Sequence, residues 1–272
     1  MQLHGKNLLA TFSLKWNPFS QEIPVEGIVK KDEVDRFIWR VENLVMDGGF
    51  ALVTGAPGSG KSVVMRSIDE RLSALRDIKV GVLTRPQSSL RDFYRELGHI
   101  YGVDFNMSNR FGGYNQLRAK WVHHLESTLF RPILLIDEAQ EMPEVTLNEL
   151  RLLSSVNLDS KSILTVILSG DERLPARFRL PELQPIGSRI KTRLVMRTQS
   201  KEDLAAFMRS ILTLAGNPKL MTEGLIKTLA EHSAGNYRTI MTLANELLVE
   251  AAANDISKLN EDLYLKVFSK HQ

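Results

Sequence analysis

Five short runs of mainly apolar residues lie along the middle of the chain, and helix-like patterns separate most of them. The runs cover Phe50–Gly55, Lys79–Thr84, Pro132–Glu138, Ile163–Gly170 and Arg193–Arg197. Near-continuous apolar strands that alternate with helices are typical of a parallel sheet covered on both faces. The pattern therefore predicts an α/β fold built on a parallel five-stranded sheet.

Two different patterns precede the first of these strands. The stretch "NPFSQEIPV" contains two prolines, which exclude a helix there. From Asp32, "DEVDRFIWRVENLVM" has apolar residues at helical spacing and acidic residues in the first turn, where they suit the helix dipole. The apolar stripe of this expected helix consists of Val34, Phe37, Ile38, Val41, Leu44 and Val45.

Strand-like patterns stop near residue 199. Ser200 and Asp203 have the spacing of a capping box that opens a helix, and polar or glycine-bearing segments then separate three more helices. We therefore expect three parts: an N-terminal arm or linker at 1–30, an α/β core at 31–199 and a small all-helical lid at 200–272.

Composition narrows the class of protein. A hydrophobic content of 43% with 25% charged residues is ordinary for a globular protein, and the absence of cysteine excludes disulfides and thiolate metal sites. No apolar run approaches the roughly 20 residues that span a bilayer, and the N-terminus lacks the features of a signal peptide. These observations favour a cytoplasmic protein with no membrane partner.

Positive charge is concentrated in one segment. Between Arg173 and Lys201 there are eight basic residues and one acid, whereas the whole chain has a net charge of only +3. Such a strip has three interpretations: a DNA-facing surface, an arginine that reaches a neighbouring active site, or a solvated strand edge.

The stretch "GAPGSGKS" matches the phosphate-binding pattern G-x-x-x-x-G-K-[ST] and lies between an expected strand and an expected helix. Its residues are Gly55, Ala56, Pro57, Gly58, Ser59, Gly60, Lys61 and Ser62. The glycines let backbone N–H groups surround phosphates, and the helix N-terminus adds partial positive charge. Lys61 is expected to contact the β- and γ-phosphates and Ser62 to help hold Mg²⁺, so the expected cofactors are ATP and Mg²⁺.

A second polar site follows the apolar run in "ILLIDEAQ". Asp137 leaves the strand where Mg²⁺ would lie, and Glu138 is placed to activate the attacking water as a general base. The alternative for Glu138 is a helix cap. Ser169 ends another strand and either contacts the γ-phosphate or the water, or only forms a Ser-Gly turn. The Asp-Glu pair favours nucleotide hydrolysis over phosphoryl transfer to a metabolite.

The order of these motifs resembles the AAA+ ATPases, and within them the ExeA-like branch, which includes the secretion ATPase ExeA and transposition helpers of the MuB and TnsC kind. The resemblance covers residues 12–255 and is carried by "NPFS", "GGFALVTGAPGSGKS", "LLIDEAQEM", "ILSGDERL" and "GNYRTIMTLANELL". It implies an arginine finger acting on a neighbour's γ-phosphate, with Arg189 as first choice and Arg193 as second. It also implies that Arg238 senses nucleotide, the alternative being an ordinary arginine on a helix surface. A finger acting between copies further implies that copies assemble head to tail into a ring or a helical filament.

Transposition helpers of this kind contact duplex DNA from the helix after the second strand and the loop beyond it. In this chain the matching candidates are Arg91, Arg95, Asn109, Arg110 and Tyr114. Such contacts would bind phosphates and carry little sequence information. The alternative is a solvated helix and a surface loop. His123 and His124 are adjacent and would face different directions on a helix, which argues against a metal site.

The leading hypothesis is an ATP-hydrolysing switch that assembles on double-stranded DNA and recruits or activates a transposase or integrase. One alternative is an ExeA-like secretion-assembly ATPase, although the chain ends at Gln272 without the transmembrane helix and extra domain that this resemblance implies. Others are a helicase loader or replication initiator, and a nucleotide-gated scaffold that scarcely hydrolyses.

Overall fold

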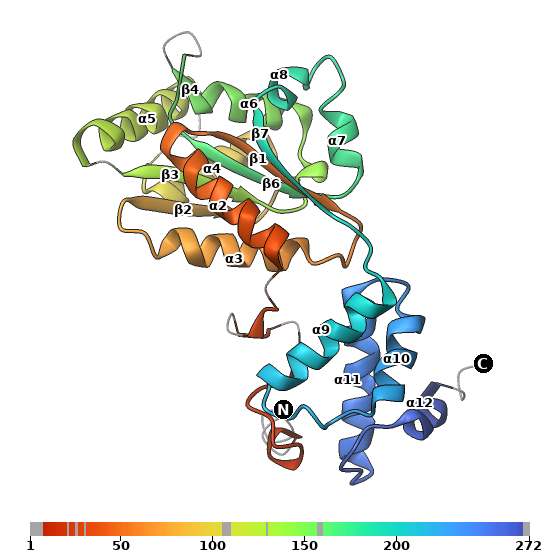
Figure 1. The fold of residues 1–272 in the computed structure, drawn as a ribbon. Coiled ribbons are helices and arrows are strands. Elements are labelled where there is room, and N and C mark those ends of the chain that lie inside the picture. The colour runs from red at the N-terminus through yellow and green to blue at the C-terminus, as the bar shows by residue number, and fades with distance from the viewer. Residues whose placement is uncertain are drawn as a thin grey trace. The chain divides into compact units, whose positions relative to one another are not determined.

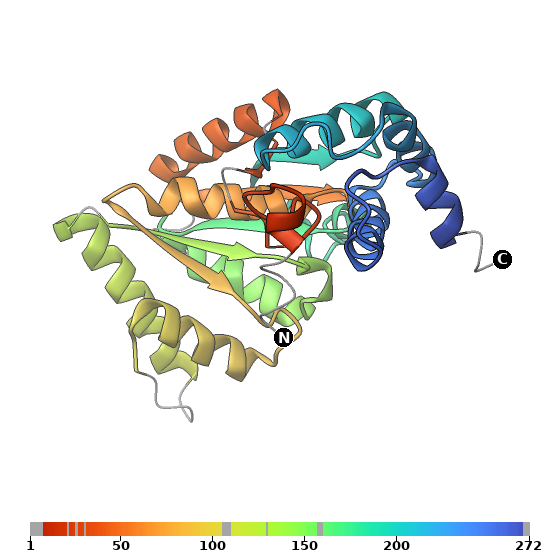
Figure 2. The ribbon, with the colours of Figure 1, turned by 90° about the horizontal axis from the view of Figure 1, so that it is seen from below.

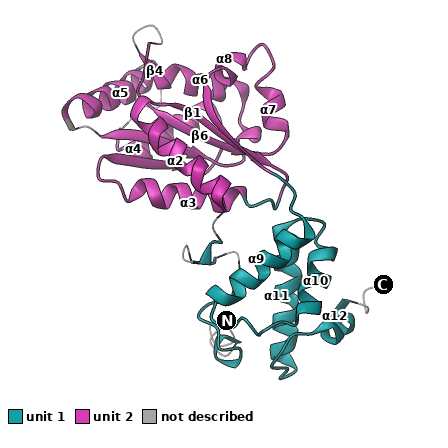
Figure 3. Cartoon of the chain, in the orientation of Figure 1, with its two compact units in different colours: residues 1–30, 58–60, 197–272 teal, residues 31–57, 61–196 magenta. Residues whose placement is uncertain are grey.

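The computed structural model of the chain describes residues 8–20, 22–24, 27–29, 31–104, 110–128, 130–156 and 160–268. The chain divides into two compact units (Figure 3). The α/β unit comprises Lys31–Pro57 and Lys61–Met196, and the helical unit comprises Met1–Lys30, Gly58–Gly60 and Arg197–Gln272.

The α/β unit contains the expected parallel five-stranded sheet, in the order β2-β3-β6-β1-β7 (Figure 1). Its strands are β1 (Gly49–Gly55), β2 (Ile78–Leu83), β3 (Arg131–Ile136), β6 (Thr165–Gly170) and β7 (Ile190–Met196). The order places the carboxyl ends of β3, β6 and β1 next to one another. Polar residues that follow these three strands therefore meet at one edge of the sheet.

Helices cover both faces of the sheet (Figure 2). The α-helices of this unit are α2 (Asp32–Asp47), α3 (Lys61–Ser73), α4 (Leu90–Tyr101), α5 (Arg110–His123), α6 (Glu144–Ser154), α7 (Arg173–Arg177) and α8 (Gln184–Gly187). Shorter elements are the π-helix η2 (His124–Thr128), the 3-10 helix η3 (Ala139–Glu141) and an antiparallel pair, β4 (Ser155–Val156) with β5 (Lys161–Ser162).

Each face of the sheet has its own hydrophobic core, because side chains alternate between the two faces of a strand. On β1, Phe50 and Leu52 pack with residues of α4, α5 and α6, whereas Ala51 and Val53 pack with α2 and α3. The five fully buried residues of the α2 stripe are Phe37, Ile38, Val41, Leu44 and Val45, while Val34 packs at its margin. The predicted stripe of this helix is confirmed, and the two cores hold the sheet rigidly beneath its polar edge.

The helical unit contains α9 (Lys201–Leu214), α10 (Glu223–His232), α11 (Tyr237–Ala253) and α12 (Glu261–Phe268). Ser200 and Asp203 form the predicted capping box at the start of α9. The N-terminal segment belongs to the same core: Phe12 and Phe19 are buried with residues of these helices, and the Asn17 side chain donates to Asn245 Oδ1 at 2.9 Å. The described part of the arm therefore packs on this chain's own helical unit.

Candidate nucleotide-hydrolysis site

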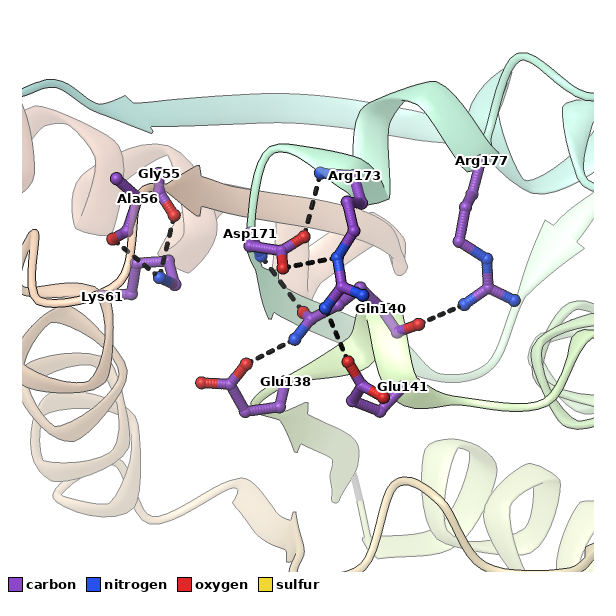
Figure 4. A network of polar contacts seen from close by, with 9 residues as sticks. All are labelled: Gly55, Ala56, Lys61, Glu138, Gln140, Glu141, Asp171, Arg173 and Arg177. Atoms are coloured by element: carbon purple, nitrogen blue, oxygen red, sulfur yellow. Dashed lines mark hydrogen bonds and ion pairs between the residues drawn. The ribbon is translucent and has the colours of Figure 1, made fainter.

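The phosphate-binding loop connects β1 to α3, as predicted. Gly58 and Gly60 have φ of 78° and 99°, conformations that favour glycine and that let the loop turn tightly. Lys61 is buried, and its Nζ donates to the carbonyls of Gly55 at 2.9 Å and Ala56 at 3.1 Å (Figure 4). The lysine ammonium is therefore held inside the loop, beside the N-terminus of α3.

Polar atoms of this loop fit an anion. Ser59 Oγ is buried and has no hydrogen-bond partner in the described structure. An unpartnered buried hydroxyl is unfavourable unless a ligand or water satisfies it. Together with the helix N-terminus and the Lys61 ammonium, it makes this loop suited to the phosphates of a nucleotide.

Asp137 is the centre of a hydrogen-bonded cluster at the carboxyl edge of the sheet. Its Oδ2 accepts from Ser62 Oγ at 2.9 Å, and its Oδ1 accepts from Ser169 Oγ at 2.7 Å and from the Glu138 N–H at 2.9 Å. The structure thus brings together residues from α3, from the end of β3 and from β6. A carboxylate and a hydroxyl are oxygen ligands of the kind that Mg²⁺ prefers, so Ser62 and Asp137 fit the predicted metal role.

Ser169 is completely buried, and its hydroxyl is directed at Asp137. It is therefore placed to orient the Asp137 carboxylate.

Glu138 follows Asp137 in a left-handed backbone conformation, with φ of 50° and ψ of 38°. This conformation is uncommon for a residue with a side chain and ends the strand abruptly. The Glu138 side chain is exposed, and its Oε2 accepts from Gln140 Nε2 at 2.5 Å. The Glu138 carboxylate makes no contact with the Asp137 side chain and is open to solvent. It can therefore accept a proton from water, as a general base does.

The sequence did not predict the contacts that hold the segment after Glu138. Gln140 and Asp171 are joined by a hydrogen bond from the Asp171 N–H to Gln140 Oε1 at 3.1 Å. Arg177 donates to the carbonyl oxygens of Gln140 at 2.6 Å and Met142 at 3.0 Å. Gln140 belongs to the quoted stretch "ILLIDEAQ", but its partners follow the next strand, and local pattern gives no signal of that pairing.

Of the two predicted arginine fingers, Arg189 immediately precedes β7, and Arg193 lies in the middle of that strand, opposite Leu52 of β1. Arg189 is partly buried and donates to the carbonyl oxygen of Pro185, and exposed Arg193 donates to that of Gly187 at 3.2 Å. Burial, together with nearby Arg151, lowers the pKa of the Arg189 guanidinium below its usual value. Neither arginine contacts the Asp137 cluster.

The basic residues between Arg173 and Lys201 differ in their contacts. Arg177 is committed to the backbone contacts above, and Arg173 pairs with Asp171 and Glu141, both at 2.7 Å. Arg193 and Arg197 are exposed. Arg238, the predicted nucleotide sensor, is exposed in the first turn of α11 in the helical unit.

The predicted DNA contacts are of two kinds. Arg91 and Arg95 are exposed on α4, where Arg95 pairs with Asp92 at 2.7 Å. Tyr114 is partly buried and donates to the carbonyl oxygen of Leu152 at 3.3 Å, so it packs α5 against α6. Asn109 lies outside the described residues, as does the side chain of Arg110 at the start of α5.

Two negative findings hold for the described ranges alone. Within them, no group of three or more His, Cys, Asp and Glu side chains is arranged to hold a metal ion. The helices found there also include none with the length and hydrophobicity needed to cross a bilayer.

Comparisons with known proteins place this geometry in context. Residues 45–178 match a family model described as an AAA domain. The chain is 29% identical over 216 residues to general secretion pathway protein A of Aeromonas hydrophila. That match covers 78% of this chain and 39% of the relative, so the chain spans about two fifths of the length of this protein.

Solved structures share the fold at low sequence identity. The Aeropyrum pernix ORC2 protein, solved as ADPNP-ADP complexes, has a TM-score of 0.74 and 16% identity, with 93% of this chain and 71% of that chain covered. The Aeropyrum pernix ORC1 protein in complex with DNA has a TM-score of 0.70 and 15% identity, with coverages of 93% and 68%. At these identities the likeness shows the fold alone.

Proposed function

We propose that this chain, an AAA+ P-loop ATPase, is an ATP-dependent switch that assembles head to tail on duplex DNA and recruits or activates a transposase or integrase. ATP stabilises the assembly, and hydrolysis drives its release. We infer that Arg189 completes the hydrolysis site of a neighbouring copy, with Arg193 as the second choice, and that Arg238 senses the bound nucleotide.

The register of β1 with β7 is the observation that supports the proposed assembly of several copies. Phe50 pairs with Ile190 at the amino end of the sheet, and Gly55 pairs with Met196 at the carboxyl end. At about 3.3 Å per residue, Arg189 is thus about 20 Å along the strands from the phosphate-binding loop. This separation far exceeds the length of an arginine side chain. An arginine finger at this position therefore has to act on another copy.

Each residue of the site has a different role in the proposed ATP hydrolysis. Lys61 and the loop amides bind the phosphates, and Ser62 with Asp137 holds Mg²⁺, which would neutralise charge on the β- and γ-phosphates. Glu138 accepts a proton from the attacking water. The arginine of the neighbouring copy stabilises charge that develops in the transition state, so turnover depends on assembly.

Duplex DNA is the proposed platform for assembly. Arg91 and Arg95 present exposed guanidinium groups on α4, and guanidinium groups suit phosphate contacts that carry no sequence information. The Aeropyrum pernix ORC1 protein, which shares the fold, was solved with DNA. These observations support DNA as a partner of this chain.

Fluorescence anisotropy with a labelled random-sequence duplex tests the proposal directly. Binding is measured with ATP, ADP or no nucleotide across a salt titration. We expect tight binding with ATP only, and a logarithmic affinity that falls linearly with the logarithm of salt concentration, because phosphate contacts release counterions. Absence of binding under every nucleotide condition would refute the role on DNA.

A secretion-assembly ATPase is the second candidate, and the 29% identity to general secretion pathway protein A favours it. This candidate predicts that ATP drives self-assembly without DNA. Analytical ultracentrifugation with ATP, with and without duplex, separates the two: assembly that is indifferent to DNA supports the secretion type.

A further inference from the structure

The Gln140 side chain lies between the Glu138 carboxylate and the backbone that follows β6 (Figure 4). Gln140 is only 8% exposed. Its Nε2 donates to Glu138 Oε2 at 2.5 Å, and its Oε1 accepts from the Asp171 N–H at 3.1 Å. One amide thus joins an exposed acidic side chain to the backbone immediately after β6.

Chemistry fixes the orientation of this amide. The Asp171 N–H is only a donor, so the carbonyl end of the Gln140 side chain must face it. The NH₂ end then necessarily faces Glu138, whose ionised carboxylate is only an acceptor. Both ends of the amide are matched, and a flipped amide would place donor against donor at Asp171.

The backbone that carries Gln140 is also held. Arg177 donates to the carbonyl oxygens of Gln140 and Met142, which fixes η3 against α7. Arg173 joins Asp171 to Glu141 across the same gap. The support for the Glu138 side chain therefore comes from the segment after β6, and Glu138 itself has a left-handed backbone conformation.

We propose that Gln140 is a positioning residue, which orients the Glu138 carboxylate for proton abstraction through its anchor on the Asp171 N–H. The inference rests on the proposed role of Glu138 as the general base. Gln140 does not touch the reacting atoms; it acts through Glu138.

Gln140→Glu is the sharpest test, because it keeps the acceptor for the Asp171 N–H and replaces the donor to Glu138 by a second acceptor. Two carboxyl groups at hydrogen-bond distance do not both ionise readily, so a proton is retained to higher pH. We expect the acid limb of the kcat–pH profile to move upward by at least about one pH unit. Gln116→Glu, an exposed change of the same kind on α5, is the matched control and leaves the profile in place.

Gln140→Ala gives an independent readout and serves alone if Gln140→Glu does not fold. Loss of orientation lowers kcat by about tenfold or more, and leaves the KM for ATP within about twofold. A wild-type pH profile for Gln140→Glu, or an unchanged kcat for folded Gln140→Ala, overturns the inference.

Glu138→Gln, measured in parallel, separates failure of this inference from failure of the proposed base. If Glu138→Gln retains wild-type turnover, the base is assigned wrongly. If Glu138→Gln abolishes turnover while the Gln140 variants behave as wild type, only the positioning role fails.

Discussion

Ser169→Ala tests whether the hydrogen bonds around Asp137 orient its carboxylate for binding Mg²⁺. Ser169 is completely buried, and its hydroxyl donates to Asp137 Oδ1 at 2.7 Å. Removal of this donor leaves the Glu138 N–H, at 2.9 Å, on the same carboxylate oxygen. Asp137 would therefore lose one of its two contacts on that side.

The expected magnitude follows from these contacts. A hydrogen bond to a charged group contributes about 1.5–3 kcal/mol, and the remaining N–H places this case near the lower end. Since about 1.4 kcal/mol corresponds to tenfold in a binding constant, the Mg²⁺ concentration for half-maximal ATPase activity should rise about tenfold. ATP binding measured without Mg²⁺ should not change.

Ser154→Ala is the matched control. Ser154 is also buried, but its hydroxyl donates to the Arg151 carbonyl at 2.9 Å, away from the site. In denaturant titrations Ser154→Ala should lose about 1 kcal/mol of stability and Ser169→Ala about 1.5 kcal/mol, and only Ser169→Ala should alter the Mg²⁺ requirement. A Mg²⁺ titration of Ser169→Ala that overlays the wild-type curve would refute the reasoning.

The other predictions concern the remaining charged groups. Lys61→Ala should weaken ATP binding roughly 100-fold in isothermal titration calorimetry, because a charge-assisted phosphate contact is lost; unchanged affinity contradicts the site. Arg189→Ala should lower turnover about 10³-fold without weakening ATP binding to the monomer, and the same loss in Arg193→Ala instead would identify that residue as the finger. Mixing the Lys61→Ala and Arg189→Ala proteins should restore activity, because one supplies the arginine and the other the phosphate loop; an inactive mixture argues against action between copies. Arg173→Ala should cost less than about 1 kcal/mol in denaturant titrations, since its ion pairs are exposed, and a larger loss would show that they support the loop.

The strands could be predicted from the sequence because each contains an apolar run, although only β1, β3 and β6 are buried along nearly their whole length. β7 is one of the two edge strands, and only alternate residues of its second half are buried: Thr192, Leu194 and Met196 point inward, whereas Arg193 and Val195 are exposed. The apolar pattern predicted only the second half of β7. The strand begins at Ile190 and not at Arg193. An edge strand needs only one apolar face, and its polar positions conceal its start.

Other differences lie at strand ends. β3 ends at Ile136 and not at Glu138, because the positive φ of Glu138 turns the chain out of the sheet. β6 begins at Thr165 and not at Ile163. The β4–β5 pair has two residues in each strand, which is too short for any periodicity to register.

The phosphate-loop motif and the Asp-Glu pair could be located from local sequence because each lies in a short segment directly after one buried strand. The contacts that orient these residues could not be predicted from local sequence. Ser169 joins Asp137 across two strands, and Gln140 joins the Asp171 N–H in the same way. Such pairs depend on strand order, which puts β3 beside β6 and is not written in either segment.

The opposite placement of the phosphate loop and Arg189 on one sheet has a numerical consequence. If Arg189 acts on a neighbouring copy as proposed, an open row of n copies would have a phosphate loop without an arginine at one end and an arginine without a phosphate loop at the other. Such a row would contain n − 1 complete sites, whereas a closed ring would contain n. In a row, activity per copy rises with length, and the two ends differ in chemistry. Such a row would have an inherent direction: one terminal copy would keep its ATP for lack of a neighbour's arginine, while every other copy could hydrolyse its ATP.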